Sequence, residues 1–143
     1  MKAIAFILAL ASCCALACRA EDNTPQLQED ILPQTTNGNF VLYVSNQSSS
    51  MSPVDITIHV DGKKAVSSEF AVGNSHQWVK HTFQLPPGKH KLVAVSKKGS
   101  ATMEKEFDIK DKHWAVVDYW FSNSNQEGKK FSFMVRDTPI AFM

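Results

Sequence analysis

The feature that most constrains the fold of this chain is a series of short apolar segments, each ended by turn-forming residues. The clearest one runs from Val54 to Val60, where apolar and polar residues alternate strictly. Because successive side chains of a β-strand point to opposite faces, this alternation predicts a strand with one buried face. Asp61-Gly62 follows at once, and that dipeptide is typical of a hairpin turn.

The apolar faces of the two hairpin strands also predict their register. A loop of three residues, Asp61–Lys63, pairs Ile58 with Val66. It also pairs Val54 with Phe70, whereas a loop of two residues places Val66 and Phe70 on the polar face. Since a slip of one residue turns every side chain to the other face, we predict the longer loop.

Further strands follow the same pattern along the rest of the chain. They are predicted over residues 40–44, 78–85, 92–96, 101–109, 113–121 and 131–135, and residues 140–142 are expected to cover a sheet edge. Seven to nine short strands at regular spacing indicate an all-β fold, here a single antiparallel β-sandwich.

The cysteines set the two ends of the chain apart. All three lie within the first eighteen residues, at Cys13, Cys14 and Cys18. The chain begins with Met1-Lys2 and continues with an uncharged apolar run over residues 3–17, which is the layout of a signal peptide. That run is shorter than a membrane span requires. The exported domain is therefore predicted to be held together by burial alone, without disulfides.

The end of this leader resembles a lipid-attachment site. Ala15-Leu16-Ala17-Cys18 is similar to a bacterial lipobox, in which the cysteine is diacylated and becomes the first mature residue. On this interpretation residues 1–17 are the signal peptide, and Cys18 anchors the chain by burial of its acyl groups. Leu10-Ala11-Ser12-Cys13 resembles the same motif and would place the lipid on Cys13 instead.

Cleavage without lipidation is a second possibility. A cut after Ala17 or Ala20 would give a freely secreted protein, because both are small residues of the kind that signal peptidases accept. We favour Cys18 as the lipidation site, since Cys13 would leave a signal of only twelve residues.

Residues 18–38 are predicted to form a flexible polar tether. They hold Pro25 and Pro33 and show no sustained periodicity. Residues 39–143 then form the β-sandwich, which is the usual size for one domain. The chain carries 15 Lys and Arg against 14 Asp and Glu, and loss of Lys2 with the signal leaves 14 of each. Such a balance argues against a nucleic acid as partner.

The segment Pro87–Val95 carries a resemblance to a known class of domain. Its pattern is similar to the Pro-Gly-x-aromatic-x-hydrophobic strand entry of immunoglobulin-like extracytoplasmic sandwiches. In those folds a tyrosine often stands where His90 stands and ties its ring to the loop before the strand. An imidazole can donate a similar bond. Together with the leader, the segment resembles small bacterial lipoproteins that have an immunoglobulin-like domain.

No motif in the chain predicts catalysis or a cofactor. The five histidines are scattered, and no two are spaced to place metal ligands on one strand face: His59, His76, His81, His90 and His113. There is no Gly-x-Ser-x-Gly motif, and no cysteine follows the leader. We therefore predict no catalytic residue, no metal site and no cofactor, and we expect the protein not to be an enzyme.

The aromatic segment 113–121 is the strongest functional lead. If Tyr119 and its alternate neighbours face the core, then Trp114, Asp118 and Trp120 face outward. Asp118 is expected to bond to a neighbouring strand, with Arg136 as one partner, because an unpaired charge among apolar residues is costly. The two tryptophans would span about 20 Å. This surface is the predicted contact for a ligand or partner.

A tail covering that surface is the structural alternative. Ile140 and Phe142 in the segment 138–143 need cover, and packing on the outward tryptophans would provide it. The sequence leaves both readings open.

These observations predict an exported, lipid-anchored, non-enzymatic β-sandwich with a binding or structural role at the cell envelope. Its partners are the membrane, through the lipid, and a protein or a glycan. The first alternative function is a carbohydrate-binding module that uses Trp114 and Trp120, and a small hydrolase is the weakest alternative.

Overall fold

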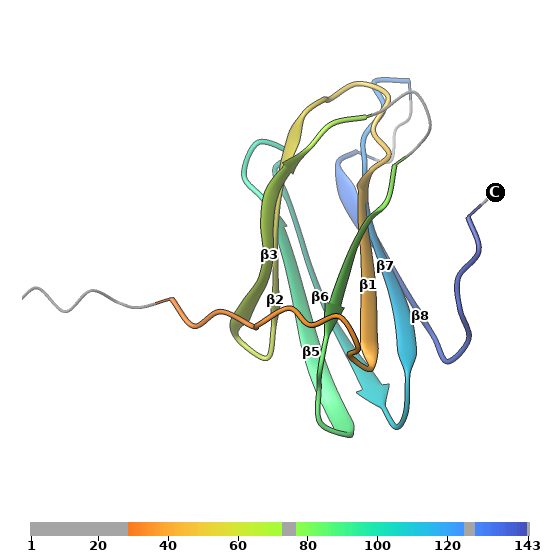
Figure 1. The fold of residues 1–143 in the computed structure, drawn as a ribbon. Helices are drawn as coiled ribbons and strands as arrows, with labels where there is room; N and C mark the ends of the chain where they lie inside the picture. The colour runs from red at the N-terminus through yellow and green to blue at the C-terminus, as the bar shows by residue number, and fades with distance from the viewer. Residues whose placement is uncertain (1–28, 73–76, 125–127, 143) are drawn as a thin grey trace, which may run out of the picture.

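A computed structural model describes residues 29–72, 77–124 and 128–142 of the chain. Within these residues the chain forms eight β-strands in two packed four-stranded sheets, which confirms the predicted all-β sandwich (Figure 1). The strands are β1 (Phe40–Asn46), β2 (Val54–Val60), β3 (Lys63–Phe70), β4 (Val79–Phe83), β5 (Gly88–Ser96), β6 (Ala101–Ile109), β7 (His113–Trp120) and β8 (Lys130–Arg136). The predicted signal peptide 1–17 and Cys13, Cys14 and Cys18 lie outside the described residues.

The strands are divided between two sheets of equal size. Sheet 1 has the order β4-β1-β7-β8, and sheet 2 has the order β3-β2-β5-β6. One strand pair departs from the predicted antiparallel pattern, because β1 and β7 run parallel, with Phe40 opposite His113 and Asn46 opposite Tyr119. Parallel neighbours need a long connection, and these two strands have five others between them in the chain.

The core lies between the sheets and is built from alternate residues of central and edge strands alike. Its largest fully buried side chains are Tyr119, Phe40, Phe83, Leu42, Ile56, Ile58, Leu92 and Ile109. The Tyr119 hydroxyl donates to the Gly99 carbonyl at 3.1 Å, so this buried polar group is satisfied. Burial also raises the pKa of Tyr119, which keeps the hydroxyl protonated.

The β2–β3 hairpin has the predicted register but a shorter loop. Val54 lies opposite Phe70 and Ile58 opposite Val66, as predicted. The predicted three-residue loop is wrong, because Asp61 and Gly62 alone form the turn, with φ angles of 51° and 79°. The extra residue is instead Ala65, which forms a bulge in β3, because Ile58 pairs with Val66 and His59 pairs with Lys64. A bulge restores the register while the turn keeps a backbone twist that matches the strands.

His90 makes the bond to the preceding loop that its position predicted. Its Nε2 lies 2.8 Å from the Pro86 carbonyl oxygen, and its Nδ1 lies 2.7 Å from Asp61 Oδ2. Both ring nitrogens of His90 are therefore engaged, one with the loop backbone and one with the hairpin turn. Burial raises the pKa of Asp61, but the bonds from His90 and from Lys91 N outweigh it and the net pKa is lowered.

The segment before β1 runs along one open side of the sandwich. Leu32 N donates to the Lys64 carbonyl at 2.9 Å, which pairs the segment with the outer edge of β3. Thr35 N donates to the Thr82 carbonyl, also at 2.9 Å, on the outer strand β4 of the other sheet. Residues 29–35 therefore connect the edge strands of the two sheets, as Figure 1 shows.

This segment is part of the predicted tether. At its end Gly38 is buried, and a Cβ there would lie 2.0 Å from the Phe83 carbonyl oxygen, so only glycine permits the approach. Residues 29–38 thus lie against the domain. The flexibility predicted for residues 18–38 as a whole stays a prediction, because 18–28 lie outside the described residues.

Candidate binding groove on sheet 1

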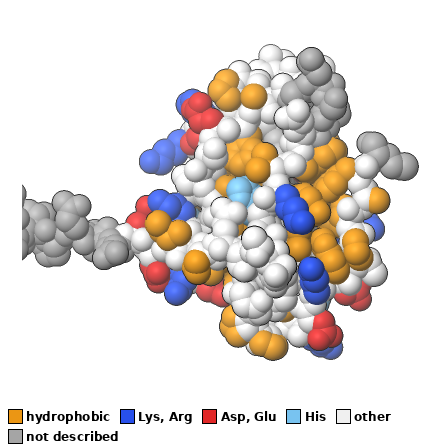
Figure 2. All heavy atoms as spheres, viewed as in Figure 1, with side chains coloured by type: hydrophobic (Ala, Val, Ile, Leu, Met, Phe, Trp, Pro, Cys, Tyr) orange, Lys and Arg blue, Asp and Glu red, His pale blue; other side chains and the backbone are white. Residues whose placement is uncertain are grey.

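The outward face of sheet 1 is unusually apolar for a solvent-facing surface. Val41 on β1 and Val116 on β7 alternate with core residues, and yet they are only 2% and 4% exposed. Figure 2 shows hydrophobic side chains gathered on the side of the molecule where the C-terminal tail runs. Something other than the core must therefore cover this face.

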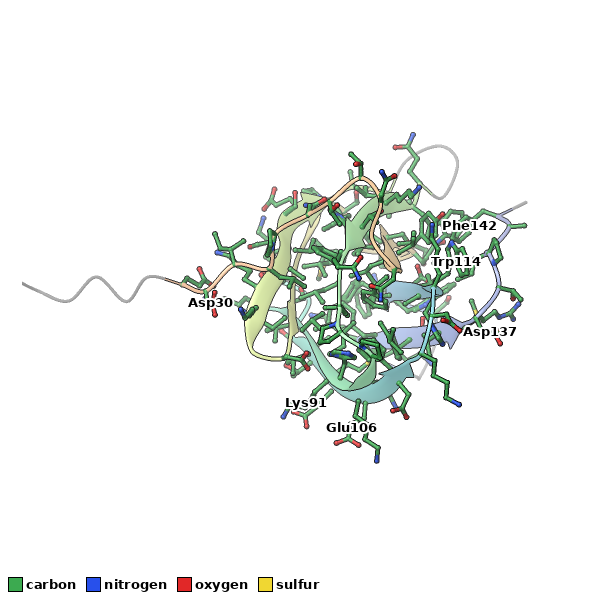
Figure 3. All side chains as sticks on the ribbon, turned by 60° about the horizontal axis from the view of Figure 1, so that its bottom comes forward. Asp30, Lys91, Glu106, Trp114, Asp137 and Phe142 are labelled. Atoms are coloured by element: carbon green, nitrogen blue, oxygen red, sulfur yellow. The ribbon has the colours of Figure 1, made fainter. Side chains whose placement is uncertain are left out.

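The C-terminal tail, residues 137–142, supplies part of that cover. The Phe142 ring stacks on Trp78 with 4.2 Å between centroids, and it meets Tyr43 edge-on at 4.8 Å. Ile140 is half-buried. Figure 3 shows the tail residues Asp137 and Phe142 on the same side of the molecule as Trp114. The tail thus covers part of this face, and its Phe142 packs on Trp78 and Tyr43, whereas the sequence suggested packing on Trp114 and Trp120.

The structure separates the two predicted tryptophans. Trp114 is half-buried, with Lys112 Nζ 5.7 Å from its ring centroid, a cation–π contact. Trp120, at the other end of β7, is 42% exposed. The two indoles therefore differ in accessibility, and only Trp120 lines the larger groove described below.

Asp118, between the tryptophans, is held by two neighbours. Its Oδ1 accepts from Ser45 Oγ at 2.6 Å and from Trp78 Nε1 at 3.0 Å. Burial raises the pKa of Asp118, and these two bonds offset only part of that rise. Arg136, the partner considered from the sequence, lies opposite Trp114 in the register, whereas Asp118 lies opposite Ser132.

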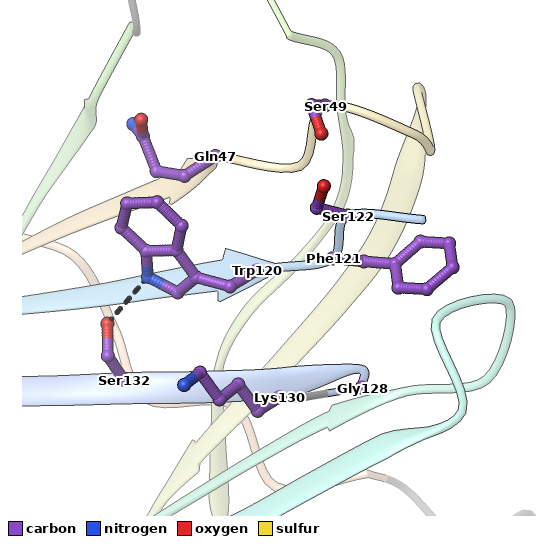
Figure 4. Close-up of a pocket in the computed structure, with 8 residues that line it drawn as sticks. All are labelled: Gln47, Ser49, Trp120, Phe121, Ser122, Gly128, Lys130 and Ser132. Carbon is purple, nitrogen blue, oxygen red and sulfur yellow. Dashed lines mark hydrogen bonds between the residues drawn. The ribbon is translucent and has the colours of Figure 1, made fainter. Parts of the chain in front are cut away.

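An open groove of about 580 Å³ lies at the uncovered end of sheet 1. We call it the Trp120 groove, and its lining residues are Gln47, Ser49, Trp120, Phe121, Ser122, Gly128, Lys130 and Ser132. Figure 4 shows the indole lying between Gln47 on one side and Ser132 with Lys130 on the other. Trp120 Nε1 donates to Ser132 Oγ at 3.0 Å, and this bond orients the ring.

The wall of the groove that follows β1 is tied to β7 by backbone bonds. Gln47 N donates to the Tyr119 carbonyl at 2.8 Å, and Ser49 N donates to the Phe121 carbonyl at 3.0 Å. Ser48 Oγ reaches the same Phe121 carbonyl at 2.8 Å. These bonds extend the β1–β7 pairing beyond the strands and hold the loop in place.

A chain of side-chain bonds connects the groove with the covered end of the face. Gln47 Nε2 donates to Ser45 Oγ at 2.8 Å, and Ser45 donates on to Asp118. Trp78 donates to the same carboxylate and stacks on Phe142 of the tail. Asp118 thus positions the groove residue Gln47 through Ser45.

Sequence reasoning found Trp120 but missed its groove partners. Gln47 directly follows β1, Ser132 and Lys130 lie on β8, and only strand pairing brings them beside Trp120. The polar residues that alternate along β8 were a signal for an outward polar row. That signal does not say which strand stands next to it.

The described residues hold neither a metal centre nor a membrane-spanning helix. Among the described residues, no three His, Cys, Asp or Glu side chains gather closely enough to hold a metal ion. In the same ranges no helix has the length and apolar character needed to cross a membrane.

Comparison with protein-family models, with curated proteins and with solved structures finds no match to this chain. The function proposed next therefore depends on the leader and on the geometry of sheet 1.

Proposed function

We propose that this chain is an exported, non-enzymatic β-sandwich of the cell envelope, anchored by a lipid on Cys18, that binds a partner through the Trp120 groove. The observation that carries the binding role is the exposed indole of Trp120, which is oriented by a hydrogen bond to Ser132. Fixing a side chain before binding lowers the entropy cost of the complex, which is what a binding residue requires.

The contrast within one sheet face supports this role. The chain uses Phe142 and the tail to cover the apolar surface around Trp78, and Val41 and Val116 are buried there. The same face leaves Trp120 exposed beside hydroxyl and amide groups. An exposed aromatic rimmed by polar groups is a common form of binding surface.

The immunoglobulin-like character of the domain is part of the proposal. The bond from the His90 ring to the Pro86 carbonyl has the arrangement in which a corner tyrosine ties its ring to the preceding loop. Domains of that kind are frequent outside the cytoplasm, in agreement with the predicted leader. The fold alone does not name the partner.

The anchor is tested by feeding a labelled fatty acid to bacteria that express the full chain. We expect the label on the wild type and on Cys13→Ala, and its loss from Cys18→Ala. Label that survives Cys18→Ala and is lost from Cys13→Ala would move the anchor to Cys13. An unlabelled wild type would mean secretion without lipid, and the anchoring part of the proposal would fall.

Binding is tested by sedimentation of the mature chain with detergent-extracted envelopes of the source bacteria, so that lipid insertion plays no part. We expect the wild type to sediment and Trp120→Ala to lose at least about tenfold in affinity. Trp114→Ala is the matched control, because it removes an indole from the half-buried end of the same strand. Equal binding by the wild type and Trp120→Ala would overturn the assignment of the groove.

A further inference from the structure

We infer that the ligand of the Trp120 groove is a glycan, one pyranose ring of which stacks on the Trp120 indole. This inference rests on the binding role proposed above. A pyranose ring has an apolar face of C–H bonds and a rim of hydroxyl groups that donate and accept hydrogen bonds. The groove offers a complement to both, as the lining residues show.

The apolar complement is the flat surface of a single indole. The Trp120 N–H already bonds Ser132 Oγ, so the ring meets a ligand with its face. Figure 4 shows the Phe121 ring directed away from Trp120. Phe121 is half-buried and packs against the core, with Lys129 Nζ 5.2 Å from its ring centroid. One exposed aromatic face is therefore available, which suits one sugar ring.

The polar complement comes from groups that keep bonding capacity. Gln47 uses one N–H for Ser45, which leaves its Oε1 and its second N–H for a ligand. Ser132 Oγ accepts from Trp120 and keeps its own O–H as a donor. These groups lie on both sides of the indole, as Figure 4 shows, where the hydroxyl rim of a stacked ring would lie.

The size and composition of the groove favour a small polar ligand over a protein. Its volume of about 580 Å³ lies within the usual range for small-molecule sites. Protein interfaces draw most of their energy from several buried anchors around a desolvated centre. Among the described residues that line the groove, Trp120 is the single exposed aromatic, and three serines and one glutamine make up much of the lining.

The decisive experiment treats the envelopes before the sedimentation assay. Periodate cleaves vicinal diols of sugars, and protease removes protein. We expect periodate to abolish the Trp120-dependent binding and protease to leave it unchanged. Binding that survives periodate and is lost with protease would overturn the glycan while leaving the groove as a protein site. On untreated envelopes, equal binding by the wild type and Trp120→Ala would instead overturn the proposed function itself.

Substitutions then separate stacking from mere apolar contact. Trp120→Phe keeps a flat ring, and we expect its affinity to fall about tenfold or less. Trp120→Leu keeps apolar volume without the ring, and we expect its affinity to fall much more. Gln47→Ala should weaken binding several-fold with the fold intact, because Gln47 is partly exposed. Equal binding by Trp120→Phe and Trp120→Leu would overturn ring stacking. A urea midpoint within the wild-type range confirms that each variant is folded.

Discussion

The outward faces of the two sheets follow the same alternation and yet have opposite chemistry. On sheet 2 the outward positions of β2 are Asp55, Thr57 and His59, and Lys91 on β5 pairs with Glu104 on β6 at 3.3 Å. On sheet 1 the outward positions of the central strands β1 and β7 hold mainly valines and aromatic residues, with the bonded pair Ser45 and Asp118 among them. Figure 3 shows Lys91 and Glu106 projecting from the rim of the molecule, away from the side where Trp114 and Phe142 lie.

Alternation of residues along a strand therefore locates the core, but it does not indicate what the opposite face of the sheet contacts. Sheet 2 meets water, so most of its outward residues are polar, apart from the partly exposed Val93 and Val95 on β5, and its ion pairs are exposed. Sheet 1 meets its own tail at one end and, on our proposal, a ligand at the other. An apolar outward face is thus a sign of a further contact, either within the chain or with a partner.

The largest expected effect comes from placing a polar group at equivalent outward positions of the two sheets. Val116→Asn should lower the free energy of unfolding by about 3 kcal/mol, because it buries an amide and removes apolar burial. Val93→Asn on the central strand β5 of sheet 2 should cost less than about 1 kcal/mol, since Val93 is partly exposed. Urea denaturation measures both. Equal losses would mean that the two outward faces are equally covered.

Removal of the tail contact should have the next largest effect. Phe142→Ala removes the ring contacts with Trp78 and Tyr43, and we expect it to lower the free energy of unfolding by about 1–2 kcal/mol. Met134→Ala is the matched control, because Met134 is an apolar residue on the outward face of sheet 1 that is 37% exposed, as Phe142 of the tail is. We expect it to cost less than about 0.5 kcal/mol. A midpoint for Phe142→Ala as high as that of Met134→Ala would show that the tail does not stabilise the face.

A carboxylate on sheet 2 should stabilise the fold at neutral pH. Burial raises the pKa of Asp55, but the bonds from Lys97 N, Lys98 N and Ser96 Oγ outweigh it and the net pKa is lowered. The stabilisation is therefore complete above the ordinary value of 3.8 and is lost as the pH falls through the lower folded value. Asp55→Asn should cost about 1 kcal/mol at pH 7 and nothing in strong acid. A loss that persists in strong acid would mean a steric cause.

The carboxylate on sheet 1 should behave in the opposite way. Because the pKa of Asp118 is raised, the folded state binds its proton more tightly than the unfolded state does. The ionised group therefore lowers stability, and that cost appears as the pH rises from 3.8 through the folded value. Asp118→Asn should raise the urea midpoint modestly at pH 7 and match the wild type in strong acid. A variant less stable than the wild type at pH 7 would contradict this sign.

Particular residues show how far sequence reasoning reached. The strand Val54–Val60 and the facing of Tyr119 into the core followed from alternation, because burial on one face selects every second residue. The hairpin register followed for the same reason. The length of the hairpin loop could not be predicted in this way, because a two-residue turn with a bulge in β3 and a three-residue loop both pair Ile58 with Val66. The parallel β1–β7 pair also had no local signal.

The sequence by itself therefore determined the class of fold, the composition of the core and the outward position of Trp120, since all three depend on period and hydrophobicity along one strand. Only the tertiary structure decided which tryptophan stays accessible and which polar groups surround it. Phe142 of the tail reaches Trp78, and Trp120 lies between Gln47, which follows β1, and Ser132 on β8. Contacts of that kind arise from strand order and tail path, which no local pattern encodes.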